Sequence, residues 1–297
     1  MNTGDDLTDL TAQPFRLTLP EVPRVPFVFA SPHSGRCYPA SFVAQSRLGP
    51  LSLRRSEDAF VDELFAVVVE LGAPLIAARF PRAYLDVNRS PAELDAAMFE
   101  GRLPGALDTA SPRVNAGLGV IPRVVRDGAE IYRDKLAARE AEERLSRLYR
   151  PYHAALTRLV EQTHAQFGAA VLIDCHSMPS AAVVPDIVLG DRYGMAASPL
   201  LMRYAERIFE SRGFSVARNA PYAGGYTTHV HGRPLRGVHA LQIEINRALY
   251  LDEERIEKSP RFEALRMRIA DCLMELVALD RMLLRAPGLR DFPFAAE

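Results

Sequence analysis

Polar residues that can do chemistry stand at the ends of short apolar runs in this sequence. They are two histidines, one glutamate and an Asn-Arg pair: His33, His176, Glu244, Asn88 and Arg89. Continuous apolar runs of this kind are typical of strands buried on both faces of a sheet. Because ligands of open α/β sheets bind outside the carboxyl ends of the strands, we expect these side chains to converge on one pocket.

Two histidines and a carboxylate are the protein ligands of many catalytic zinc sites, in which water takes the fourth position. His33 and His176 are the candidate imidazole ligands, although each also has a structural interpretation. The carboxylate is either Asp58 or its neighbour Glu57, and the alternative role of Asp58 is interaction with the dipole of the helix predicted to follow it. Asp174 is expected to orient the His176 ring by a hydrogen bond, provided that the strand continues to His176.

Glu244 is the candidate general base. It lies inside the apolar run 241–245, where a carboxylate is costly to bury unless it is paired or functional. Beside a zinc ion it would deprotonate the attacking water. The structural alternative is an ion pair between Glu244 and Arg247 or another buried cation.

Other catalytic arrangements have little support. Cys175 and His176 are adjacent, so in a strand their side chains point apart and form no nucleophilic dyad. The serines that follow the predicted strands lack the nucleophile-elbow pattern. Gly224 and Gly225 lack the spacing of a phosphate-binding or dinucleotide-binding loop. Further histidines are expected to be structural, although any of them could line the pocket: His229, His231 and His239.

Composition excludes several classes of protein. The chain has 297 residues, 36 basic and 37 acidic side chains, and therefore no general electrostatic attraction to nucleic acid or to an anionic membrane. Three cysteines fit a reduced compartment better than a disulfide scaffold. The acidic N-terminus is unlike a secretory signal, and no apolar stretch is long enough to span a bilayer. We expect a cytoplasmic protein with a single domain over 1–297; no pattern indicates an oligomeric state.

Strands and helices alternate along most of the chain. Strands are predicted at 27–30, 74–80, 84–87, 169–174, 187–189, 214–217 and 238–245. Helices are predicted after Ser56, within 129–167 with a break or kink at Pro151, at 199–211, and over most of 252–284. Residues 90–128 are predicted to form a long irregular excursion, as lids and binding loops do. The fold class is therefore α/β, with a mixed, largely parallel sheet covered on both faces.

Several motifs together resemble the N-formylglutamate amidohydrolase family over roughly residues 27–254. They are SPHSG (31–35), EDAFVDELF (57–65), FPRAYLDVNR (80–89), RPYHAAL (150–156), IDCHS (173–177), YAGGYTT (222–228) and GVHALQIEINRALYLDE (237–253). The family is similar in fold to zinc-dependent carboxypeptidases and aspartoacylases. This similarity implies a three-layer α/β/α, zinc-exopeptidase-like domain.

The resemblance implies roles for individual residues. The Asp-x-His-Ser pattern of zinc peptidases matches 174–177 and implies His176 as a ligand. Their first ligands usually form His-x-x-Glu, but Arg36 stands at the third position after His33, so Asp58 becomes the candidate carboxylate. Glu244 matches the catalytic glutamate of a late strand, and Asn88-Arg89 resembles the pair that grips the substrate carboxylate in aspartoacylases.

The implied function is zinc-dependent hydrolysis of N-formyl-L-glutamate with release of formate, a step of histidine catabolism. The substrate carries carboxylates, for which Arg89 is the first candidate clamp, followed by Arg82 and Arg247. Gly224 and Gly225 would let the backbone approach the substrate closely. The alternatives are a related deacylase or carboxypeptidase for another N-acyl amino acid, and a non-catalytic binding protein on the same fold.

Overall fold

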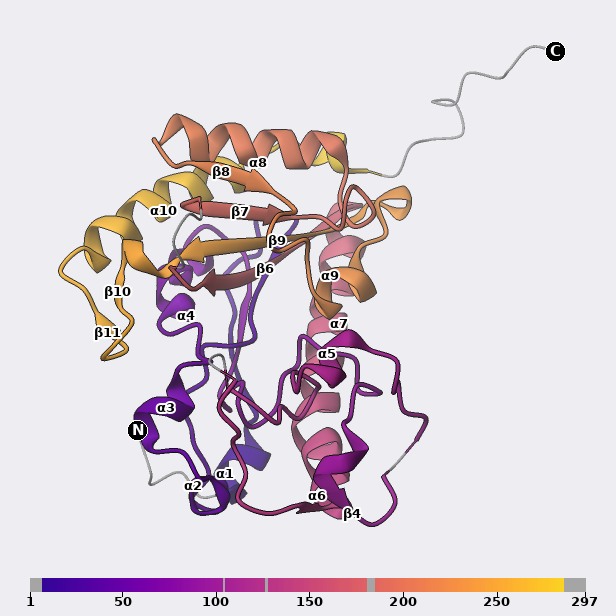
Figure 1. The fold of residues 1–297 in the computed structure, drawn as a ribbon. Coiled ribbons are helices and arrows are strands. Elements are labelled where there is room, and N and C mark those ends of the chain that lie inside the picture. Colours follow the sequence, from indigo (N-terminus) through magenta and orange to yellow (C-terminus); the bar gives the residue numbers. More distant parts are fainter. Residues whose placement is uncertain (1–6, 104, 126–127, 181–184, 286–297) are drawn as a thin grey trace.

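A mixed seven-stranded sheet forms the centre of the protein (Figure 1). The computed structural model describes residues 7–103, 105–125, 128–180 and 185–285. The strands follow the order β1 (Phe15–Thr18), β3 (Leu75–Ala78), β2 (Phe27–Ser31), β6 (Ala170–Met178), β9 (Val238–Asn246), β7 (Ile187–Gly190) and β8 (Val216–Arg218). The strands from β3 to β9 in this order are parallel, β1 and β7 are antiparallel to their inner neighbours, and β8 is parallel to β7. Two short ladders lie outside the sheet: β4 (Phe99–Glu100) with β5 (Leu136–Ala137), and β10 (Leu251–Asp252) with β11 (Glu257–Lys258).

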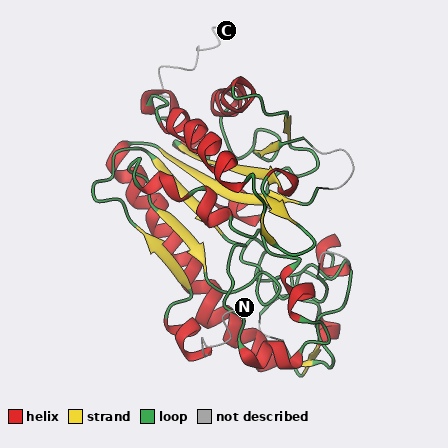
Figure 2. Ribbon diagram, turned by 90° about the vertical axis from the view of Figure 1, so that its left-hand side faces the viewer, coloured by secondary structure: helices red, strands yellow, loops and turns green. Residues whose placement is uncertain are grey.

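Helices cover both faces of the sheet, which gives three layers (Figure 2). One face packs against α4 (Val61–Leu64), η1 (Ala66–Val69), α8 (Pro199–Ser211) and α10 (Phe262–Val277). The other face packs against α1 (Leu7–Ala12), α2 (Ala40–Gln45), α3 (Pro50–Arg54), α6 (Ala138–Arg144), the π-helical turn η3 (Leu145–Tyr149) and α7 (Arg150–Phe167). The remaining elements are η2 (Ala96–Met98), α5 (Pro112–Asn115), α9 (Tyr226–His231), η4 (Pro234–Arg236), η5 (Arg247–Leu249) and η6 (Arg281–Leu284).

Side-chain alternation along β6 and β9 places polar groups on one face of the sheet. On β6, Ile173 and Cys175 belong to the core that α8 and α10 cover, whereas Leu172 belongs to the core that α7 covers. Asp174 and His176 continue the side of Leu172, because successive side chains of a strand point to opposite faces. The strand extends to Met178, so the condition for placing Asp174 beside His176 is met.

Most predicted elements are confirmed. The strands at 27–30, 187–189 and 238–245 and the helix at 199–211 have the expected positions, and the strand at 169–174 is longer than expected. The N-terminal segment that the structure describes includes the edge strand β1. Residues 90–128 are largely irregular, with α5 and the short η2 and β4, and residues 126–127 of this stretch lie outside the described part.

Other expectations are wrong in detail. The apolar run 84–87 is buried but forms consecutive turns, in which the N–H groups of Tyr84 and Leu85 donate to the carbonyl of Pro81. The helix after Ser56 begins only at Val61, because Phe60 has a left-handed backbone with φ of 63°.

Three further boundaries differ from expectation. The helical run begins at Ala138 rather than 129. Pro151 does not end the helical run, because a π-helical turn precedes it. Such a wider turn accommodates a proline, which has no N–H to donate and whose ring crowds the carbonyl of the preceding turn. The C-terminal helix is confined to α10, because β10 and β11 form a small hairpin before it.

In the part of the chain that the structure describes, no helix has the length and apolar character needed to cross a membrane.

Candidate active site

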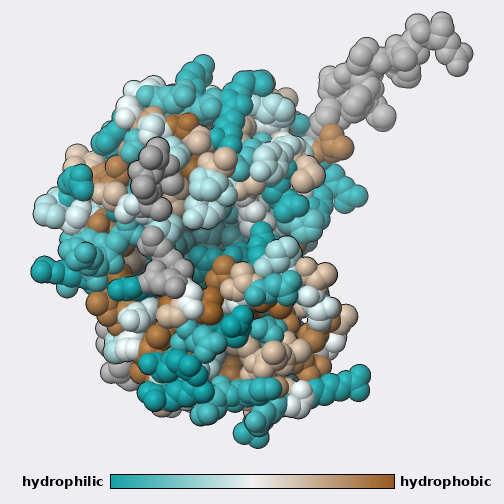
Figure 3. Space-filling model, in the orientation of Figure 1, coloured by the Kyte–Doolittle hydropathy of each residue, from teal (hydrophilic) through white to brown (hydrophobic). Residues whose placement is uncertain are grey.

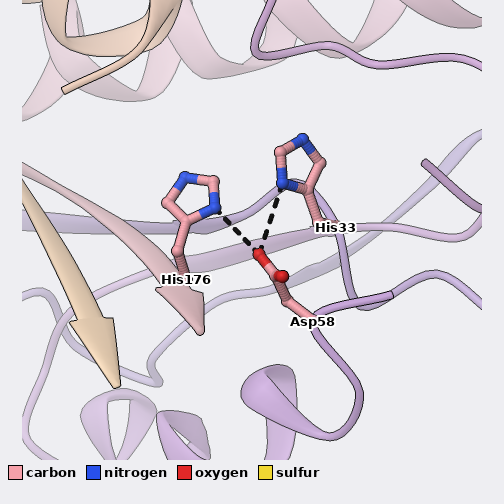
Figure 4. Close-up of side chains that lie close together, drawn as sticks. All are labelled: His33, Asp58 and His176. Carbon is pink, nitrogen blue, oxygen red and sulfur yellow. Dashed lines mark hydrogen bonds and ion pairs between the residues drawn. The ribbon is translucent and has the colours of Figure 1, made fainter. Parts of the chain in front are cut away.

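One carboxylate oxygen faces two imidazole rings at the carboxyl edge of the sheet (Figure 4). Oδ2 of Asp58 lies 2.9 Å from Nδ1 of His176 and 3.3 Å from Nδ1 of His33. His33 follows β2, His176 lies near the end of β6, and Asp58 stands in the loop before α4, where its N–H donates to the carbonyl of His33. All three side chains are buried. The three ligand atoms lie within 4.8 Å of one another, and could hold a metal ion.

Both imidazoles are also held by a carboxylate at their other nitrogen. Nε2 of His33 lies 2.7 Å from Oδ1 of Asp86, and Nε2 of His176 lies 3.0 Å from Oδ2 of Asp174. Histidines that bind metals commonly direct the second nitrogen to such a partner, which fixes the ring and leaves the first nitrogen free to coordinate. The arrangement therefore directs both Nδ1 atoms toward Asp58.

The electrostatics of this cluster favour a cation. Burial alone would raise the pKa of Asp58, but hydrogen bonds from His176 and His33 and the nearby Arg247 hold it well below its usual range. Burial likewise opposes ionisation of His176, yet Asp174 and Asp58 raise the pKa of this histidine well above its usual value. At His176 the nearby carboxylates therefore outweigh the cost of burial and favour a positive charge. The donor set of two imidazoles and one carboxylate fits zinc, with a position left for water.

The rival carboxylate, Glu57, is engaged elsewhere. Its Oε1 accepts hydrogen bonds from the hydroxyl of Tyr38 at 2.7 Å and from Nε of Arg54 at 3.0 Å. The second oxygen of Asp58, in contrast, accepts from Nη2 of Arg247 at 2.8 Å. The geometry thus brings Asp58, and not Glu57, to the histidines.

Glu244 lies on β9 directly opposite His176 in the parallel register. Its Oε1 accepts a hydrogen bond from Nε2 of Gln242 at 2.7 Å, and burial raises the pKa of Glu244 to about 7. Arg247, its suggested ion-pair partner, instead donates to Asp58 and to the hydroxyl of Ser177. A carboxylate with a pKa near neutrality suits proton transfer at physiological pH.

The amide of Asn88 connects three segments of the site. Its Nδ2 donates to Oδ2 of Asp174 at 2.9 Å and lies 3.0 Å from Nε2 of His176, and its Oδ1 accepts from the N–H of Thr227 at 2.8 Å. Gly225 leaves room for this amide, since a Cβ at that position would lie 2.5 Å from both Nδ2 and Oδ1. Asn88 thereby helps to fix Asp174 and His176.

These groups open into a cavity of about 550 Å³, a size typical of small-molecule sites. The space-filling view shows a hollow near the middle of this face, with hydrophilic residues gathered in it (Figure 3). Every residue predicted for the site lines the cavity: His33, Asp58, Arg82, Asn88, Arg89, His176, Gly224, Gly225, Glu244 and Arg247. The residues predicted for the site therefore share one cavity, and their roles stay predictions.

Sequence reasoning missed several residues around this cavity. Asp86 had no signal beyond its place two residues before Asn88, and Gln242 could have been noticed as a second polar residue in the run that contains Glu244. Arg113 belongs to the irregular excursion and had no pattern at all. Of the three further histidines that were considered as possible pocket residues, His239 is structural, because it contacts the carbonyl of Leu284 and the N–H of Ser198, whereas the other two belong to α9: His229 and His231.

Comparison with known proteins points to one family. The model of the N-formylglutamate amidohydrolase family matches residues 25–251. The chain is 30% identical to an N-formylglutamate deformylase of Pseudomonas aeruginosa over 87% of this chain and 95% of that one. It is 28% identical to one of Pseudomonas putida over 77% and 83% of the two chains.

Solved structures agree with these sequence matches. A crystal structure of an N-formylglutamate amidohydrolase from Ralstonia eutropha superposes with a TM-score of 0.83 at 40% identity, covering 89% of this chain and 96% of that chain. A gene product of Agrobacterium tumefaciens, at 17% identity and a TM-score of 0.63, shares the fold over 92% and 96% of the two chains. The chain therefore belongs to the N-formylglutamate amidohydrolase family.

Proposed function

We propose that the chain is a zinc-dependent deformylase that hydrolyses N-formyl-L-glutamate to formate and L-glutamate. One observation carries the proposal: a cluster that could hold a metal ion, a separate buried carboxylate and several arginines line the same cavity. The substrate follows from the relatives, which are named for deformylation of N-formylglutamate. The described cysteines, Cys37, Cys175 and Cys272, form no disulfide, which is consistent with a role in the cytoplasm, where histidine catabolism would supply the substrate.

In this proposal His33, Asp58 and His176 hold the zinc ion. When bound, zinc polarises the formyl carbonyl and lowers the pKa of water. The Nε2–H groups of the two imidazoles donate to Asp86 and Asp174, which keeps both Nδ1 atoms available as ligands.

Glu244 moves the proton in the proposed reaction. Its carboxylate takes a proton from water as the water oxygen attacks the formyl carbon. When the C–N bond breaks, protonated Glu244 returns this proton to the nitrogen of the departing glutamate. The hydrogen bond from Gln242 and the strand register opposite His176 hold the carboxylate at the reacting centre. Its raised pKa of about 7 allows both transfers near neutral pH.

Arginines of the cavity bind the substrate carboxylates. Arg82 and Arg247 each use part of the guanidinium on a protein carboxylate, Asp86 and Asp58 respectively, while Arg89 donates to backbone carbonyls. A guanidinium has several donors, so Arg82 and Arg89 retain N–H groups for a carboxylate of the substrate, whereas Arg247, which also donates to Ser177, has fewer left. Gly224 and Gly225 are proposed to let the substrate approach the backbone closely.

The substitution Glu244→Gln tests this mechanism. Removing the base is expected to lower kcat for formate release by about 10²–10⁴-fold, while zinc content and binding of N-formyl-L-glutamate are retained. Glu210→Gln, which changes an exposed glutamate of α8, is the matched control. If E244Q retains full turnover, the proposed base is wrong; if it loses zinc, Glu244 is a ligand instead.

A further inference from the structure

Arg113, an arginine of the irregular excursion, lines the cavity together with Arg82 and Arg89. Arg113 belongs to α5 and lines the cavity together with Leu118 and Val124 of the same excursion. Burial lowers the pKa of Arg89, and the positive charges of Arg82 and Arg113 lower it further. Guanidinium groups gathered in this way repel one another, and an anionic ligand would relieve that repulsion.

Arg113 is held more loosely than the other arginines. Nε of Arg82 donates to Asp86 at 2.9 Å, and Nη2 of Arg247 donates to Asp58 at 2.8 Å. Among the residues that the structure describes, the carboxylate nearest to Arg113 belongs to Glu93, at 3.8 Å from Nη1, which is beyond hydrogen-bond distance. The Arg113 side chain is 46% exposed, so its donors remain available to a ligand in the cavity.

The backbone beneath Arg113 is nevertheless well fixed. Oε1 of Glu93 accepts from the hydroxyl of Ser111 at 2.6 Å, and Oε2 accepts from the N–H of Ser90 at 2.9 Å. The hydroxyl of Ser111 in turn accepts from the N–H of Arg113, which caps the first turn of α5. A guanidinium that is not hydrogen-bonded to a carboxylate, on a backbone that hydrogen bonds hold in place, is suited to binding a ligand.

We propose that Arg113 binds the side-chain carboxylate of the substrate and thereby selects acidic over neutral N-formyl amino acids. The inference rests on the proposed function, whose substrate carries two carboxylates. Arg82 lies on the side of the reacting centre, because its partner Asp86 also holds His33. Arg113 lies on the excursion, where Leu118 and Val124 provide apolar surface for the methylene groups of the side chain.

The test compares N-formyl-L-glutamate with N-formyl-L-glutamine, its neutral isostere. In Arg113→Ala, the ratio of kcat/KM for the acidic substrate to that for the neutral one is expected to fall about 30-fold, mainly through a higher KM. Arg113→Lys, which keeps the charge but not the planar fork, should lose about a few-fold. Arg102→Ala is the matched control, because Arg102 is an exposed arginine of the same excursion and does not line the cavity.

Binding without turnover gives a second readout. In the E244Q background, R113A should weaken binding of N-formyl-L-glutamate by a similar factor and leave the weaker binding of N-formyl-L-glutamine nearly constant. An unchanged preference in R113A, or an equal loss for both ligands, overturns the role of Arg113 while the deformylase function stands. Absence of formate release by the wild type from either substrate contradicts the proposed function, and this inference falls with it.

Discussion

Two parts of the cavity lining are built in different ways. One wall consists of the ends of β2, β6 and β9, where the polar side chains are buried and bound to one another. The other wall comes from the excursion, where Arg113 is 46% exposed and its ion pair is long. Side chains fixed on strands keep reacting atoms in place, whereas an irregular segment can change its residues at little cost to the fold. The comparison predicts that chemistry depends on the strand wall and substrate choice on the excursion.

Among substitutions at the metal cluster, the largest effect is expected at Asp58, which the loop before α4 places against the histidines of the strand wall. Asp58→Asn removes the charge that both histidines and Arg247 share, and is expected to lower formate release by about 10³-fold. Glu57→Gln is the matched control at the adjacent position: it disturbs contacts with Tyr38 and Arg54 but leaves the cluster intact. A variant E57Q that loses activity while D58N keeps it would reverse the assignment of the carboxylate.

A smaller effect is expected from the two aspartates that contact the Nε2 atoms of the histidines. Asp86→Asn and Asp174→Asn remove the charged partners of the Nε2 atoms, and should each weaken zinc affinity by about 10–100-fold. Competition with a chelator of known affinity measures this change. Asp95→Asn, a substitution in the excursion, provides the control. If D86N and D174N bind zinc as tightly as the wild type, the hydrogen bonds of Asp86 and Asp174 do not support zinc binding by the histidines.

The smallest effect is expected from an ion pair within the excursion. Arg123 lies 3.2 Å from Asp95 and 3.6 Å from Glu130, and its side chain is partly exposed. Surface pairs of this kind contribute about 0–1 kcal/mol to stability, so Arg123→Ala should change kcat/KM by less than about two-fold. Steady-state kinetics on N-formyl-L-glutamate measures this change in kcat/KM. A loss as large as that of D58N would remove the distinction between the two walls.

Much of the strand wall could be predicted from the sequence. His176 and Glu244 are polar residues in strongly apolar runs, so the pattern alone predicts that they are buried and marks them as candidates for a functional role. The strands that carry them, β6 and β9, are almost continuously buried along their length. Pattern reasoning therefore located residues that the structure brings together at the cavity.

The excursion and the supporting contacts could not be predicted in this way. Asp86 reaches His33 because residues 81–89 form consecutive turns, and the apolar run there indicated a strand. Arg113 has no periodic neighbours, and its place at the cavity depends on the bonds that Glu93 makes to Ser90 and Ser111. Such long-range side-chain contacts leave no local pattern in the sequence.

Zinc content tests the central claim most directly, namely that His33, Asp58 and His176 hold one metal ion. Elemental analysis would be made on the wild type and on the double variant His33→Ala, His176→Ala, after loading with zinc and removal of free metal. We predict about one zinc per chain in the wild type and roughly a tenth of that in the double variant. A wild type without zinc after loading, or a double variant that keeps it, would contradict this site.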